Sequence, residues 1–196
     1  RSFEIIEEHL KSVKLSGFQK DVIKRVVHAT ADFSYIKALK FHPDAIKSGV
    51  AAIKKGKNII TDASMVKAGI NKNIASNFKM KVLCFINDKS IIRMSEKLNI
   101  TRAILSMRKA SKLMDKSIVS IGNAPTALFE LCDLIEKGEA SPALIIGVPV
   151  GFVGAKESKK KLITLNIPYI TNISRKGGSN IAAAIVNALL KIAEKQ

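Results

Sequence analysis

Two hydrophobic periods alternate along this chain. Near the N-terminus, apolar residues recur at helical spacing in segments 3–10 and 22–27, and a further helical stretch opens at Pro43 and closes at Gly56. Beyond that glycine, short continuous apolar runs alternate with helical segments. The predicted strands are 58–61, 81–86, 117–121, 143–147 and 169–171, and the predicted helices lie near 65–68, 90–98, 103–114, 126–137, 157–165 and 180–194.

This alternation predicts the fold class. Strand and helix repeated in turn are typical of an α/β protein with a parallel sheet and helices on both faces. The runs VLCFI (82–86) and LIIG (144–147) are apolar throughout, as expected of strands buried on both faces. No repeat or internal linker interrupts the pattern. Residues 1–196 are therefore predicted to form a single domain, with a helical N-terminal lead-in and a sheet of about five strands.

The charged residues of the chain indicate which classes of ligand or partner it can bind. The chain of 196 residues has 33 Lys and Arg against 16 Asp and Glu, a formal net charge of +17. Such a charge attracts polyanions, either nucleic acid or a small molecule with many carboxylates, although a general bias toward Lys explains it without a ligand. Nucleic acid gains little further support, because Trp is absent, Tyr occurs only 2 times and the Lys residues are scattered. We expect no nucleic-acid partner.

Cysteine usage and hydropathy indicate a cytoplasmic protein. Cys84 and Cys132 lie inside apolar runs, which predicts buried free thiols in a reducing compartment, and they form no metal-binding pair. No apolar run reaches the roughly 20 residues that cross a bilayer, and the opening RSFEIIEEH is not a signal peptide. We expect neither a membrane nor a metal partner. Because the chain lacks an initiator Met, we expect a short N-terminal piece to precede it.

The richest candidate binding segment follows a predicted strand. In open α/β sheets, ligands bind beyond the carboxyl ends of the strands. Segment 147–159, GVPVGFVGAKESK, contains Gly147, Gly151 and Gly154, which let the backbone pass close to a ligand, and the next helix N-terminus can receive an anion. It is not a phosphate loop, because Gly-Lys-Ser/Thr is missing, and a proline occupies a glycine position of the dinucleotide fingerprint. A tight turn with no ligand is the alternative.

Other strand ends carry polar residues. Asp62 follows the first predicted strand directly. Asn123, in the turn GNAPT (122–126), is suited to capping the next helix and also to binding a ligand. Arg175 and Ser179 flank two glycines before the last helix. That pattern suits a clamp for carboxylate or phosphate, and it suits a solvated surface turn equally well.

The three histidines differ in context. His9 lies beside two glutamates on an outward helical turn and is expected to be solvated, and His42 precedes a proline and is expected in a loop. His28 ends the apolar run VVHAT, where a histidine is more often structural than catalytic. No second ligand lies near it at metal-binding spacing, and no Gly-x-Ser-x-Gly elbow exists. The residues alone leave the role of His28 open.

Three segments become specific when they are taken together. They are SIVSIGNAPTALFELCDLIEKG (117–138), IIGVPVGFVGAKESK (145–159) and RKGGSN (175–180), in this order and spacing. RSFEII, RVVHAT, FHPDAI, TDASMVKAGI and NITR (99–102) agree with them. Together they resemble the precorrin-8X methylmutase family, which includes cobalt-precorrin-8 methylmutases, and the resemblance covers essentially the whole chain.

The resemblance implies a flavodoxin-like, three-layer α/β/α fold, a homodimer and no cofactor. The family's reaction moves a methyl group from ring carbon 11 to ring carbon 12 of precorrin-8 or its cobalt form, giving hydrogenobyrinate or cobyrinate in vitamin B12 biosynthesis. The family's catalytic histidine lies in an Ile/Val-His-Ala motif, so the resemblance makes His28 the general acid. The residues expected to bind the polycarboxylated corrinoid are Arg1, Ser2, Asp62, Thr101, Arg102, Asn123, Gly147, Gly151, Gly154, Arg175 and Ser179.

Physical chemistry is consistent with this assignment. A basic protein with Gly-rich strand-end turns can meet the carboxylate arms, while the macrocycle needs an apolar cleft. Protonating the macrocycle makes it electron-poor and lowers the barrier to methyl migration. A histidine suits this step because its unperturbed pKa is about 6.5.

Two motifs depart from the family's usual pattern. His-Ala is often followed by Cys-Gly, and here by Thr30-Ala31, while the usual Cys-Asp-Ala-Glu-Met reads TDASM (61–65). These changes leave His28 and Asp62 in place. The alternatives to an isomerase are a corrinoid-binding or carrier protein without catalysis and, on charge alone, a nucleic-acid-binding protein.

Overall fold

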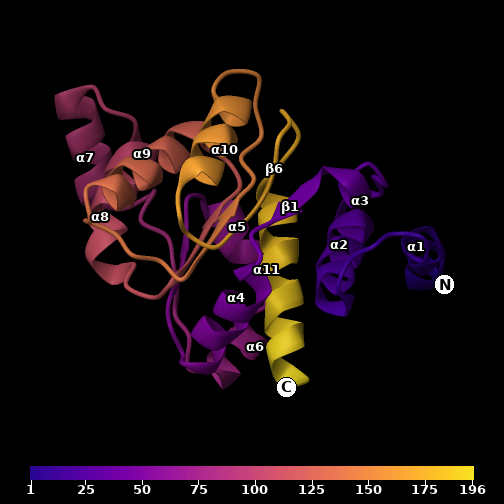
Figure 1. Ribbon diagram of the computed structural model, residues 1–196. Coiled ribbons are helices and arrows are strands. Elements are labelled where there is room, and N and C mark those ends of the chain that lie inside the picture. Colours follow the sequence, from indigo (N-terminus) through magenta and orange to yellow (C-terminus); the bar gives the residue numbers. More distant parts are fainter.

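A six-stranded sheet forms the centre of the molecule, with helices on both faces (Figure 1). This computed structural model describes all residues from 1 to 196. The strands are β1 (Leu39–Phe41), β2 (Ile59–Thr61), β3 (Val82–Leu83), β4 (Ile118–Ile121), β5 (Leu144–Gly147) and β6 (Tyr169–Asn172). The helices are α1 (Ser2–Leu10), α2 (Gly17–Thr30), α3 (Tyr35–Ala38), α4 (Ala45–Lys54), α5 (Ser64–Gly69), α6 (Lys72–Asn77), α7 (Lys89–Leu98), α8 (Arg102–Ala110), α9 (Pro125–Glu136), α10 (Ala155–Thr164) and α11 (Ser179–Glu194), with a 3₁₀ turn at Ser111–Leu113.

The strand order confirms the predicted fold class. The order across the sheet is β1-β6-β5-β4-β2-β3. Strands β2 to β6 are mutually parallel where they pair. Counted from β2, they follow the 2-1-3-4-5 order of flavodoxin-like folds. The order reverses between β2 and β4, so the crevice that such folds use for ligands lies between the ends of these two strands.

The sheet contains one strand more than the five predicted. β1 pairs antiparallel with β6, with Leu39 opposite Asn172 and Phe41 opposite Ile170. Its three residues include an exposed lysine and form no apolar run, so their strand conformation comes from pairing with a partner far along the chain. β3 is also shorter than the predicted 81–86, and the short helix α6 was not predicted.

Two apolar cores lie on the two faces of the sheet. One core joins the sheet to α1, α2, α4, α5, α6 and α11, and the other joins it to α8, α9 and α10. α11 lies against the sheet and α2 packs on α11. The buried face of α2 consists of Val22, Ile23, Val26 and Val27, and each such side chain contributes about 1.5–3 kcal/mol when it is fully buried.

The two ends of α2 are defined by local hydrogen bonds and backbone geometry. At the start, the Ser16 hydroxyl accepts from the Gln19 amide at 3.2 Å, and the Ser16 amide donates to the Gln19 side chain at 3.0 Å. This reciprocal capping box fixes the first turn. At the end, Ala31 adopts the left-handed conformation with φ of 53°, which stops the helix three residues after His28. The exposed face of the last turn therefore carries the histidine.

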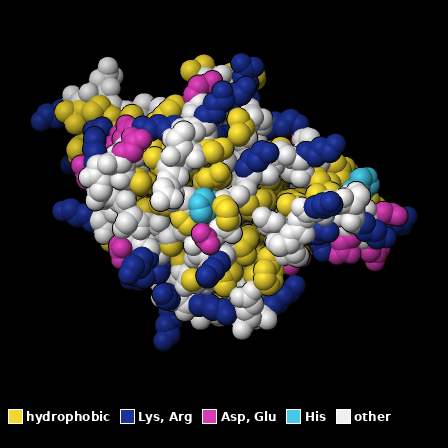
Figure 2. All heavy atoms as spheres, viewed as in Figure 1, with side chains coloured by type: hydrophobic (Ala, Val, Ile, Leu, Met, Phe, Trp, Pro, Cys, Tyr) yellow, Lys and Arg dark blue, Asp and Glu magenta, His cyan; other side chains and the backbone are white.

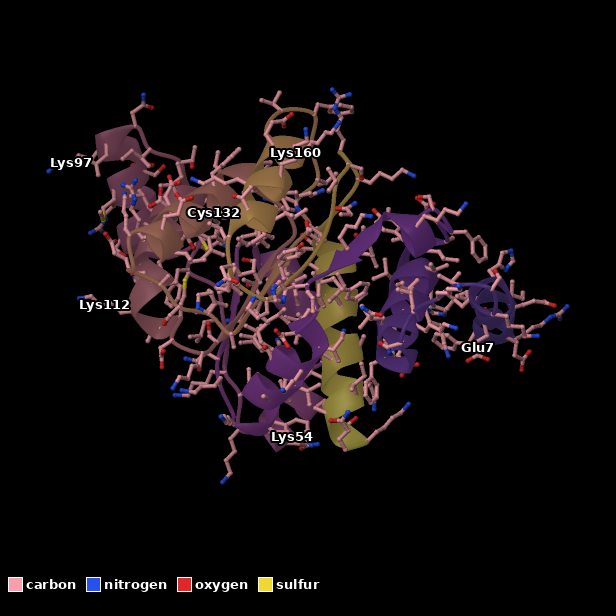
Figure 3. All side chains as sticks on the ribbon, in the orientation of Figure 1. Glu7, Lys54, Lys97, Lys112, Cys132 and Lys160 are labelled. Carbon is pink, nitrogen blue, oxygen red and sulfur yellow. The ribbon has the colours of Figure 1, made fainter.

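The two cysteines and the surface charges test two further predictions from the sequence. Cys132 is buried on α9 (Figure 3), as predicted, but Cys84 is only half-buried because it follows the short edge strand β3. No helix has the length and apolar character needed to span a bilayer. Lys and Arg side chains are distributed over the face shown in Figure 2 rather than gathered in one patch.

Candidate active site

The turns that follow β4, β5 and β6 meet at the carboxyl edge of the sheet. The Gly178 amide donates to the Val148 carbonyl at 3.0 Å, and the Gly151 amide donates to the Arg175 carbonyl at 3.2 Å. Three segments that are far apart in the sequence thus form one continuous backbone surface. We call this surface the three-turn edge, and it comprises 122–124, 148–154 and 173–178.

Glycine is required where these turns approach one another. A Cβ on Gly177 would lie 2.2 Å from the Val148 carbonyl oxygen, and a Cβ on Gly122 would lie 2.9 Å from the Gly178 carbonyl oxygen. Both distances are far inside van der Waals contact, so a side chain would force the turns apart. Gly154 has a φ of 76° and precedes α10, where an L-residue would be strained.

The buried Asp62 side chain binds the backbone of the three-turn edge from the interior of the protein. Its Oδ1 accepts from the Gly122 amide at 3.0 Å, and its Oδ2 accepts from the Asn123 and Ala124 amides at 2.8 and 2.7 Å. The side chain is fully buried. Burial raises the pKa of Asp62, and the three amide donors oppose that rise. Both oxygens of Asp62 thus bind backbone amides in the interior at the β2–β4 crevice, so the side chain positions the 122–124 turn, and its contact with a substrate stays a prediction.

Lys159 is a second buried charge, and sequence reasoning missed it. Its ammonium donates to the carbonyls of Ser174 and Lys176 at 2.8 and 2.6 Å. Burial lowers the pKa of Lys159 to about 8. The next residue, Lys160, is exposed on the outside of α10 (Figure 3). The available signal was the helical stripe of buried positions 155, 158, 159 and 162, in which a lysine occupies an apolar site.

Exposed apolar side chains lie on the three-turn edge and at the start of α5. The turn after β5 presents Phe152 and Val153, which are 86% and 89% exposed, and Met65 at the start of α5 is 72% exposed. Val150 and Ile173 add to this rim. Large apolar side chains gathered at such exposure mark a surface for binding. They suit the flat face of a macrocycle or the surface of a second protein.

His28 lies on the face of the molecule built from α2 and α11. Its exposed ring stacks on Phe3 of α1, with ring centroids 4.6 Å apart and planes inclined by 15°. The imidazole borders a hollow of about 320 Å³. The lining of this hollow is completed by Arg25, Ala29, Gly69, Asn180, Ala183, Ala184 and Asn187. The stacking orients the ring while leaving its edge accessible to a ligand.

The predicted pair Arg1 and Ser2 directly precedes the phenylalanine that stacks on His28. Arg1 and Ser2 are exposed at the start of α1, next to the Phe3 that stacks on the histidine. A contact of Arg1 and Ser2 with a substrate bound at His28 stays a prediction.

The pair Thr101 and Arg102 lies on the other face of the sheet. Thr101 caps α8 by accepting from the Ile104 amide at 3.5 Å, and Arg102 is the exposed first residue of that helix. α8 belongs to the core opposite to that of α2, and the two helices lie on opposite sides of the molecule in Figure 1. Within this chain, the structure does not bring Thr101 and Arg102 together with His28.

Asn123 and Arg175 lie on the three-turn edge, while Gly147 directly precedes it as the last residue of β5 and Ser179 directly follows it. Asn123 is exposed and does not cap α9, whose first cap position is Ala124. Arg175 is exposed in the turn after β6, and Ser179 is the half-buried first residue of α11. His9 is exposed as expected and stacks on Phe33 at 4.2 Å.

Comparison with known proteins gives one consistent result. The family described as Precorrin-8X methylmutase matches residues 1–192. The cobalt-precorrin-8 methylmutase of Priestia megaterium is 46% identical over 194 residues, covering 99% of this chain and 86% of that protein. The cobalt-precorrin-8 methylmutase of Salmonella typhimurium is 38% identical over 195 residues, covering 96% and 91%.

A solved structure supports the same conclusion. Precorrin-8X methylmutase from Thermus thermophilus superimposes with a TM-score of 0.92 at 34% identity, covering 99% of this chain and 96% of that chain. Sequence and fold agree along nearly the whole length of the chain. The chain therefore belongs to the precorrin-8X methylmutase family of isomerases.

Proposed function

We propose that this protein catalyses the methyl shift that converts precorrin-8, or its cobalt form, into hydrogenobyrinate or cobyrinate in cobalamin biosynthesis, with His28 as general acid. The observation that carries the proposal is the His28 ring itself. It is exposed, it is oriented by stacking on Phe3, and it borders a hollow at the end of α2. A histidine held in this way can deliver a proton to a bound ring.

The methyl shift requires a proton donor, partners for the carboxylate arms and an apolar surface for the macrocycle. The His28 ring gives a proton to the macrocycle, which makes the conjugated system electron-poor. The methyl group then leaves one ring carbon and bonds to its neighbour, and the proton returns to the imidazole, so the net reaction is an isomerisation. The carboxylate arms are neutralised by cations such as Arg1 and Arg175 and by the amides of the three-turn edge. The apolar rim covers the face of the macrocycle and excludes water.

We also propose that the protein is a cytoplasmic homodimer with the substrate cleft near the subunit interface. Thr101 and Arg102 lie on the face opposite His28, so these expected substrate contacts and the histidine need a second copy to share one site. The exposed apolar side chains of α1, Phe3 and Ile5, supply surface for such a contact. Light scattering at micromolar concentration should give the mass of a dimer, and the mass of a monomer would contradict this arrangement.

Removal of His28 tests the catalytic role. The pure protein is incubated with metal-free and cobalt-containing precorrin-8 while the visible spectrum is followed. His28→Ala and His28→Asn should both bind product and slow the methyl shift by about 10²–10⁴-fold, the usual contribution of acid–base catalysis. His9→Ala is the matched control, because His9 is also exposed and stacked on a phenylalanine.

Each other outcome has a definite meaning. Full activity of both His28 variants would make the histidine structural and refute the assignment. Full activity of the Asn variant alone would mean that His28 supplies a hydrogen bond and no proton. Wild-type protein that binds both corrinoids and converts neither would be a carrier rather than an isomerase.

A further inference from the structure

Two lysines, Lys159 and Lys176, connect the turn after β6 to its neighbours on two opposite sides. From α10, the Lys159 ammonium donates to the Ser174 and Lys176 carbonyls at 2.8 and 2.6 Å. On the opposite side, the Lys176 ammonium donates to Asp32 Oδ2 at 2.8 Å and to Ser34 Oγ at 3.1 Å. The turn therefore connects α10 to the segment that follows α2.

The interior of this turn is a polar network. The Asn172 side-chain amide donates to Ser174 Oγ at 2.9 Å and to the Lys176 carbonyl at 3.0 Å. The Lys176 carbonyl thus receives bonds from both Asn172 and Lys159. A carbonyl with two donors, one of them charged, is held firmly in place. The backbone at Lys176, and with it the root of its side chain, is fixed from inside the protein.

The far end of this connection is the last turn of α2. The Asp32 amide donates to Thr30 Oγ1 at 3.2 Å, and the Thr30 hydroxyl bonds back to the Val26 carbonyl at 2.8 Å. The Asn180 side chain, just beyond the turn, lies 3.5 Å from the Ala29 carbonyl. Asp32 and Ser34 therefore follow the end of α2, and Thr30 connects Asp32 to the last turn of this helix, which carries His28.

The cost of burying Lys159 argues for a role other than stability. Its ammonium is fully buried and no carboxylate lies within ion-pair distance. Apolar side chains that replace buried charges are often neutral or stabilising. Methionine has nearly the length of lysine and would fill the same space. A buried charge that packing does not need is best explained by what its hydrogen bonds position.

We propose that Lys159 is a positioning residue that holds the β6–α11 turn so that Lys176, through Asp32 and Ser34, fixes the end of α2 and the place of His28. The expected effect on turnover rests on the proposed function of His28. The expected structural effect, a less firmly held end of α2 when the Lys159 ammonium is removed, is independent of that function.

Two readouts on one set of variants test this coupling. Hydrogen–deuterium exchange followed by mass spectrometry reports the protection of amides 27–34 in the full-length protein. Lys159→Met and Lys176→Met should both speed exchange in this segment, whereas Lys160→Met, which removes the exposed lysine next in sequence, should not. In turnover, Lys159→Met should lower kcat by about 10- to 100-fold while KM changes little, because a small misplacement of a catalytic group acts on the chemical step.

The double variant separates a chain of contacts from two independent effects. If Lys159 acts through the turn and Lys176, Lys159→Met combined with Lys176→Met should be no slower than the more impaired single variant. Multiplied effects on kcat would overturn the proposal, and so would unchanged exchange of amides 27–34 in Lys159→Met. If Lys159→Met fails to fold, unchanged exchange in Lys176→Met would still overturn the proposal, and this variant should fold because the Lys176 side chain is exposed. Full activity of His28→Ala would instead refute the proposed function, while the exchange experiment would still test the coupling.

Discussion

Replacing Asp62 separates the charge of this buried side chain from its shape. The carboxylate accepts three backbone amides between 2.7 and 3.0 Å. An asparagine has the same shape with a single oxygen. If that oxygen takes the place of Oδ2, it keeps the bonds from Asn123 and Ala124. Its NH₂ group then faces the Gly122 amide, so one bond is lost and two donors oppose each other.

The magnitude follows from these contacts. A buried N–H left without an acceptor costs about 1–3 kcal/mol. The neutral asparagine avoids burying a charge, which offsets part of that cost, so we expect Asp62→Asn to lower the free energy of unfolding by about 1–3 kcal/mol. Asp62→Ala leaves three amides without an acceptor and should cost at least about 3 kcal/mol. The ranking of the two variants, with Asp62→Ala less stable than Asp62→Asn, is a stricter test than either magnitude.

Urea denaturation followed by far-ultraviolet circular dichroism measures these differences. Asp44→Asn is the matched control, because Asp44 is exposed and makes no capping bond at the start of α4. That variant should stay within about 0.5 kcal/mol of wild type. If Asp62→Ala unfolds at the same urea concentration as Asp44→Asn, the carboxylate does not hold the turn and the reasoning fails.

Two further predictions concern the turns and the second buried charge. Gly177→Ala should lower the free energy of unfolding by about 1–3 kcal/mol, because its Cβ would overlap the Val148 carbonyl oxygen. Gly17→Ala is the control and should be nearly neutral, because a Cβ there meets nothing within 4 Å. Equal thermal unfolding midpoints for the two variants would refute the close approach of the turns. Burial lowers the pKa of Lys159 to about 8 from the 10.5 of an exposed lysine, so the folded state releases this proton before the unfolded state does. The free energy of unfolding relative to Lys159→Met should therefore rise between pH 8 and 10.5, by up to about 3 kcal/mol, and a flat or falling difference would contradict it.

The strands that were predictable are those with their own apolar signal. β2, β4 and β5 are buried along their whole length, and a continuous apolar run reports such burial directly. β1 has no such signal, because its conformation depends on hydrogen bonds to β6, which lies about 130 residues further along the chain. Local pattern therefore predicts buried strands and misses those created by pairing.

The candidate site shows the same division. The carboxyl ends of the strands were predicted to carry it, and the turns do meet there. The depth of Asp62 was not predictable, because a polar residue after a strand faces either solvent or a neighbouring turn, and only the packing of β4 beside β2 decides which. Lys159 had a visible signal, a charge in an apolar helical stripe, but its partners are backbone carbonyls that no side-chain pattern reveals.

The two edges of the sheet bear on how this protein avoids unwanted assembly. An open strand edge offers unpaired amides and carbonyls to any passing strand, which is a route to aggregation. Here β3 ends one side after two residues, and β1 ends the other with three residues that have Lys40 at their centre. Neither edge is long enough to template another chain. A concentrated preparation of this protein should therefore resist growth by strand addition.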